Sequence, residues 1–150
     1  METNTSKIFT QFTAGSFGGT LLGIAGFSTM MNYGGNGGCL AFIDALFSTA
    51  GYESCGSFGS IFGLIVGAII GIAVLSKVKI QRYSKVAAWL LIGAFVLPFL
   101  YGAIVFWPPF EDDDLLIVPP VIIGFMIASI IPSAVIIGAI HCRNIFRKKQ

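Results

Sequence analysis

The sequence predicts an all-α integral membrane protein with four transmembrane helices, both termini in the cytoplasm and a short amphipathic helix in the first extracytoplasmic loop. Of the 150 residues, 55% are hydrophobic and only 11% are charged, whereas soluble domains contain about 25% charged residues. Four apolar stretches are long enough for a helix to cross the hydrocarbon core of a bilayer. We therefore expect a single four-helix membrane domain over residues 1–150, with spans at about 8–31, 58–76, 86–107 and 115–140.

The first two predicted spans carry glycines four residues apart. Residues at this spacing form a strip along one side of a helix, and a strip of glycine lets another helix backbone approach closely in lipid. We expect the two strips to pack against each other, although glycine is also generally frequent in membrane helices. The predicted packing residues are Gly15, Gly19, Gly23, Gly59, Gly63, Gly67 and Gly71.

The segment between these spans contains a turn and a short helix. Residues 33–38 read YGGNGG, which predicts a flexible turn because glycine and asparagine accept positive φ. Apolar residues then recur at roughly helical spacing around Asp44, which predicts an amphipathic helix on the membrane surface or over the bundle. Its apolar residues are Leu40, Phe42, Ile43, Leu46 and Phe47.

Cys39 and Cys55 flank that short helix. If the loop lies outside the cytosol, a disulfide that ties its two ends together is the simplest interpretation. A redox-active pair is the alternative, but membrane thiol oxidoreductases use a Cys-x-x-Cys pair together with a second pair, and the chain has neither. We favour the structural disulfide.

Prolines interrupt the last two predicted spans. Pro98 should kink the third span and Pro132 the fourth, because each removes a backbone donor and crowds the preceding turn. Ser129 and Ser133 flank the second of these prolines, and hydroxyl side chains can satisfy backbone groups that a proline frees in lipid.

The loop charges predict the orientation of the chain. Basic residues cluster after the second and fourth spans, whereas the loops after the first and third contain only acids. The positive-inside rule places the basic segments and both termini in the cytoplasm, where the cations can meet anionic lipid headgroups. These lipid-facing residues are Lys77, Lys79, Arg82, Lys85, Arg143, Arg147, Lys148 and Lys149.

Two further features are the acidic run after the third span and the cysteine after the fourth. The run from Glu111 to Asp114 is expected to be a solvated loop rather than a cation site, because consecutive acids point in different directions. Cys142 adjoins the predicted cytoplasmic surface, where we expect a free thiol, with reversible palmitoylation as the alternative.

The sequence offers no reactive site. No predicted span has Asp, Glu, Lys, Arg or His in its interior, although such residues mark proton and ion pathways. We therefore expect no catalytic residue, no cofactor, no metal and no nucleic-acid partner. The expected location is the plasma membrane or a bacterial inner membrane, as a multi-pass protein.

Two functions from different classes fit this composition. The first is a non-enzymatic protein that binds other membrane proteins, as an accessory or assembly subunit or an immunity-type factor. The alternative is a homo-oligomeric channel or passive transporter, in which polar residues of several copies line a path. The residues expected to line such a path are Gln11, Thr13, Ser16, Thr20 and Ser60.

Overall fold

The computed structural model describes residues 4–47, 51–77, 82–105 and 118–147. Over these residues the chain is helical and contains no strand, as the composition predicts. The helices are α1 (Asn4–Gly37), α2 (Ala41–Phe47), α3 (Tyr52–Lys77), α4 (Tyr83–Val105), α5 (Val118–Ala128) and α6 (Ile130–Arg147).

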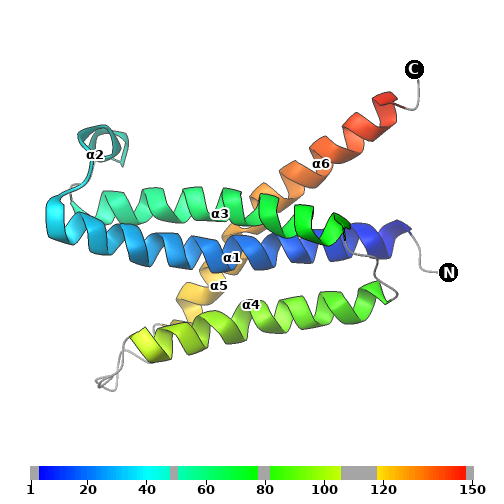
Figure 1. Cartoon of the computed structure of the whole chain (residues 1–150), viewed down its shortest axis with the longest axis horizontal. Coiled ribbons are helices and arrows are strands. Elements are labelled where there is room, and N and C mark those ends of the chain that lie inside the picture. The colour runs from blue at the N-terminus through cyan, green and yellow to red at the C-terminus, as the bar shows by residue number, and fades with distance from the viewer. Residues whose placement is uncertain (1–3, 48–50, 78–81, 106–117, 148–150) are drawn as a thin grey trace.

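Helix α1 is the centre of the bundle. It contacts α3, α4, α5 and α6, and its contact with α3 is by far the most extensive. In Figure 1, α3 runs alongside α1 in the opposite direction, α4 lies along another side, and α5 and α6 cross the pair obliquely. The C-terminal half of α6 extends away from the other helices.

Three helices are long and apolar enough to cross a membrane, which makes this a membrane-protein fold by length and composition. They cover Tyr52–Lys77, Tyr83–Tyr101 and Pro119–Arg143, with mean hydropathies of 2.5, 1.7 and 2.5. The first predicted span lies within α1, which has 34 residues but is not among these three. A span at about residues 8–31 therefore stays a prediction.

The turn expected at residues 33–38 begins later than predicted. Helix α1 continues to Gly37, and Gly38 adopts a positive φ of 77° while its amide donates to the carbonyl of Gly34 at 3.1 Å. This is a helix C-terminal cap. The YGGNGG segment is mostly helical because tertiary contacts outweigh the low helix propensity of glycine: a Cβ on Gly34 would lie 2.9 Å from the Cβ of Cys55.

Helix α2 covers Ala41–Phe47. The last span differs in detail from expectation. The last span is divided at Ser129 into α5 and α6, three residues before Pro132, which cannot donate to the carbonyl of Ala128. In contrast, α4 continues through the buried Pro98 without interruption.

Candidate functional site

The contact between α1 and α3 is the most tightly packed part of the described chain. A Cβ placed on Gly67 would come within 3.0 Å of the carbonyl oxygen of Gly18, and a Cβ on Gly63 would meet that of Leu22 in the same way. Only glycine lets helix backbones approach this closely. We call this contact the seam. On α3 it is formed by Gly59, Gly63, Gly67 and Gly71, which meet Gly26, Leu22, Gly18 and Ala14 of α1 in antiparallel order.

The strip of Gly15, Gly19 and Gly23 lies in the seam as the sequence suggested, with its Cα atoms near Gly71, Gly67 and Gly63, but the closest atoms of α1 come from the residue before each glycine. The carbonyls that face the α3 glycines belong to residues 14, 18, 22 and 26, rather than to Gly15, Gly19 and Gly23. These three glycines lie at the edge of the seam, where they meet α5 and α6 as well as α3. A Cβ on Gly19 would lie 3.0 Å from Ser129 Cβ, and one on Gly23 would lie 3.0 Å from Phe125 Cδ1.

A group of buried hydroxyls fills the space next to these glycines. Thr20 and Ser129 are fully buried, and the Thr20 hydroxyl lies 2.8 Å from the carbonyl oxygen of Ser16 and 3.4 Å from Ser129 Oγ. Ser133 donates to the carbonyl of Ser129 at 2.8 Å. The Thr20–Ser129 contact joins the junction of α5 and α6 to the middle of α1, whereas the other two hydrogen bonds are local to their own segments.

The polar side chains of α1 therefore form hydrogen bonds within a single chain. Thr13 donates to the carbonyl of Thr10 at 2.9 Å, and Thr10 donates to the carbonyl of Tyr83, at the start of α4, at 3.1 Å. Ser16 Oγ is buried with no hydrogen-bond partner among the described residues. Ser60 donates to the carbonyl of Gly56 at 2.9 Å. The hydroxyls predicted to line a path between copies thus lie mostly inside one bundle.

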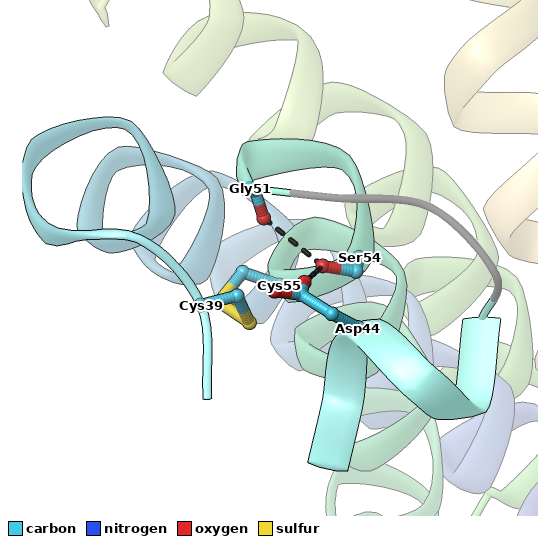
Figure 2. The surroundings of a disulfide bond; sticks show 5 residues. All are labelled: Cys39, Asp44, Gly51, Ser54 and Cys55. Atoms are coloured by element: carbon cyan, nitrogen blue, oxygen red, sulfur yellow. Dashed lines mark hydrogen bonds between the residues drawn. A yellow bond between two sulfur atoms is a disulfide. The ribbon is translucent and has the colours of Figure 1, made fainter. Parts of the chain in front are cut away.

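The predicted disulfide between Cys39 and Cys55 is confirmed. The two Cα atoms are 5.6 Å apart and the S–S distance is 2.00 Å, which is ordinary disulfide geometry. Figure 2 shows a second link beside it: the Ser54 hydroxyl contacts the carboxylate of Asp44 and the carbonyl oxygen of Gly51. The disulfide and this side-chain contact together attach the α2 segment to the first turn of α3.

Charges of opposite sign lie at opposite ends of the described bundle. Lys7 lies near the start of α1, Lys77 ends α3, and Arg82 and Lys85 lie at the start of α4. These helix ends lie at the end of the bundle where the chain starts, and α6 is directed toward the same side (Figure 1). Asp44 and Glu53, the acids among the described residues, belong to α2 and the start of α3 at the opposite end.

The remaining predicted site residues lie mainly near the C-terminus, and some of them are outside the described ranges. Arg143 is exposed and Arg147 ends α6, and Cys142 is an exposed free thiol. Within the described ranges, no group of three or more His, Cys, Asp or Glu side chains could hold a metal ion. Lys79, Lys148, Lys149 and the acidic run 111–114 lie outside the described residues.

The fold and the seam define a class of protein: an all-helical membrane protein built around one closely packed antiparallel helix pair. No family model, curated protein or solved structure matches the chain.

Proposed function

We propose that the chain is a four-span membrane protein with both termini in the cytoplasm. Helix α1 supplies the first span, in addition to the three apolar ones. It is less apolar than they are, but between Thr10 and Ser28 only Leu22 is exposed, so few of its polar groups would face lipid. A central helix surrounded by three apolar helices needs little apolar surface of its own, provided its polar groups are satisfied inside the protein. Its 34 residues correspond to about 51 Å, more than the roughly 30 Å hydrocarbon core.

The charge distribution supports the proposed orientation. All described Lys and Arg residues belong to the helix ends that the positive-inside rule assigns to the cytoplasm, and the described acids lie at the other end. The disulfide supports the same orientation, because disulfides persist on the oxidising side of a membrane. Helix α2 then belongs to the extracytoplasmic side.

Cysteine labelling in sealed membrane vesicles tests this topology. The native Cys142 and a Thr5→Cys variant should react with a membrane-impermeant maleimide from the cytoplasmic side only, and an Asn36→Cys variant from the opposite side only. The two variants are made in a Cys142→Ser background, and all three positions are exposed. Labelling of Thr5→Cys and Asn36→Cys from the same side would show that α1 does not cross the membrane.

The function that this geometry favours is non-enzymatic binding of other membrane proteins. The observation that carries the proposal is that the glycines of α3 are packed against other helices, whereas two glycines of α5 and α6 are open. From Gly56 to Gly71, every glycine of α3 faces a neighbouring atom within the bundle, whereas Gly124 and Gly138, in α5 and α6, have nothing within 4 Å. The open glycines lie in helices with exposed branched side chains such as Ile131, which is 70% exposed. Such a surface accepts another helix closely.

An accessory or assembly subunit, or an immunity-type factor, would use this surface of α5 and α6 for its partner while the seam maintains the fold. The partner is another membrane protein or a second copy of the chain. Catalysis has no part in the proposal. No observation on the described residues favours the alternative of a homo-oligomeric channel. The hydroxyls that would line its path have hydrogen-bond partners within one chain, apart from Ser16 Oγ.

Native electrophoresis and light scattering of the protein, extracted from its own membrane in mild detergent, test the proposal. We expect a defined species heavier than one 16.0 kDa chain with its detergent micelle. Gly138→Leu should convert this species to the monomer, because the leucine side chain occupies the space that the partner helix would fill. Gly35→Leu is the matched control, since this glycine is equally open but lies at the far end of α1. A monodisperse monomer from the unmodified protein would refute the proposal.

A further inference from the structure

Helix α2 has an apolar outer face that no described part of the chain covers. Ile43 is buried against the bundle, whereas Phe42 is 61% and Leu46 68% exposed; Ala41 and Ala45 are exposed beside them. Transfer of such a surface from water to an apolar environment gains about 25 cal/mol per Å². A contiguous apolar face of this kind indicates a contact with something outside the chain.

The single charge of α2 does not interrupt this face. Asp44 is half-buried, and its carboxylate contacts the Ser54 hydroxyl at the start of α3 (Figure 2). The carboxylate is thus directed toward α3 and away from the exposed phenylalanine and leucine. Helix α2 can therefore meet an apolar medium without desolvating a bare charge, a step that would otherwise be costly.

The outer face of α2 is continuous with the apolar surface of α3. The ring centroids of Phe42 and Phe58 are 6.3 Å apart in an edge-to-face arrangement, and Phe58 is stacked on Phe62 at 6.2 Å. Phe62 is exposed on the outside of α3, a helix long and apolar enough to cross a membrane. Three rings thus connect α2 to the surface that α3 presents to lipid.

The position of Phe58 along α3 sets the depth of α2. From Phe58 to Ser76 the helix carries no charge, and this length of helix, about 28 Å, matches the hydrocarbon core. Phe58 therefore lies near the boundary between acyl chains and headgroups. Since Phe42 contacts it, α2 lies at the same level beside the first turns of α3, as Figure 1 also shows.

We propose that α2 is an interfacial helix that inserts Phe42 and Leu46 into the headgroup–acyl boundary of the bilayer, next to α3. The occupant of its apolar face is lipid. The Cys39–Cys55 disulfide and the Asp44–Ser54 contact hold α2 at this depth. The proposal depends on α3 crossing the membrane and is independent of which protein, if any, binds to α5 and α6.

Tryptophan fluorescence in lipid nanodiscs tests the depth of α2. The probe is Phe42→Trp in a Trp89→Phe, Trp107→Phe background. We expect blue-shifted emission that is strongly quenched by lipids brominated near the headgroup end of the acyl chain and only weakly by aqueous iodide. Phe62→Trp serves as the deeper control, with stronger quenching by lipids brominated further along the chain. Asn36→Trp serves as the aqueous control, with quenching by iodide alone.

Two outcomes would overturn the proposal. Quenching of Phe42→Trp by iodide but not by brominated lipid would place α2 in water. Quenching by neither would mean that protein covers this face. In each variant, resistance of Cys39 and Cys55 to a maleimide of high mass shows that the disulfide has formed and that the fold is intact, so a misfolded sample is not mistaken for either outcome.

Discussion

Replacement of Gly67 by leucine is expected to lower the free energy of unfolding by about 3 kcal/mol or more. The β-carbon alone would overlap the carbonyl of Gly18 and would lie 2.9 Å from the Cα of Gly19. These obstructing atoms belong to the backbone of a helix, so a rotamer change cannot relieve the overlap. The two helices would have to separate, and the neighbouring contacts of the seam would weaken with them.

Thermal unfolding of the purified protein in detergent micelles measures this effect. For a chain of 150 residues, a loss of about 3 kcal/mol corresponds to a decrease in Tm of roughly 10 °C. Gly35→Leu is the matched control, because this glycine also lies in a helix but has open space around it and is outside the proposed partner surface. A Gly67→Leu variant that melts together with Gly35→Leu would contradict the close contact between α1 and α3.

Removal of the disulfide is the second change with a large expected effect. The bridged cysteines are 16 residues apart in sequence, and closure of a loop of about this size stabilises the folded state by roughly 3 kcal/mol in the chain-entropy model. Cys55 is only 1% exposed, so a Cys39→Ser, Cys55→Ser variant also places a hydroxyl in a closely packed position. We expect Tm to decrease by about as much as for Gly67→Leu.

The control for this variant is Cys142→Ser, which removes a thiol that is exposed and unbridged and should leave Tm unchanged. Proteolysis between residues 39 and 55 provides a second measurement, because removal of the disulfide leaves only non-covalent side-chain contacts between α2 and α3, such as Asp44 with Ser54 and Phe42 with Phe58. Equal melting and equal proteolysis of the bridged and serine variants would show that the disulfide has no structural role.

The disulfide and the apolar helices were predictable because the signals for them are local. Cys39 and Cys55 are the two cysteines of a single loop, so few pairings compete, and long apolar runs become helices because lipid leaves backbone groups no other partner. The helix boundaries were less predictable. Residues 33–37 extend α1 despite three glycines, since the packing of Gly34 against Cys55 and Tyr52 cannot be inferred from propensity.

The interpretation of the polar residues of α1 also depended on long-range contacts. Thr13, Ser16 and Thr20 follow the same sequence pattern whether they line a path between copies or lie inside one bundle. The second arrangement is observed because Ser129 and Ser133, more than 100 residues later in the chain, meet Gly19 and Gly15. No signal within the α1 sequence indicates this partner.

The amino-acid sequence alone predicts that this chain forms apolar helices, that opposite charges collect in alternate loops and that Cys39 and Cys55 can bridge one of those loops. How the glycines of α1 pack depends on long-range contacts. Neighbouring residues on a helix are separated by about 100°, so the strip through residues 14, 18, 22 and 26 and the strip through 15, 19 and 23 lie side by side. Only the antiparallel placement of α3, with α5 and α6 across its edge, sets the carbonyls of the first strip against the α3 glycines and leaves the second strip in contact with α3 on one side and with α5 and α6 on the other.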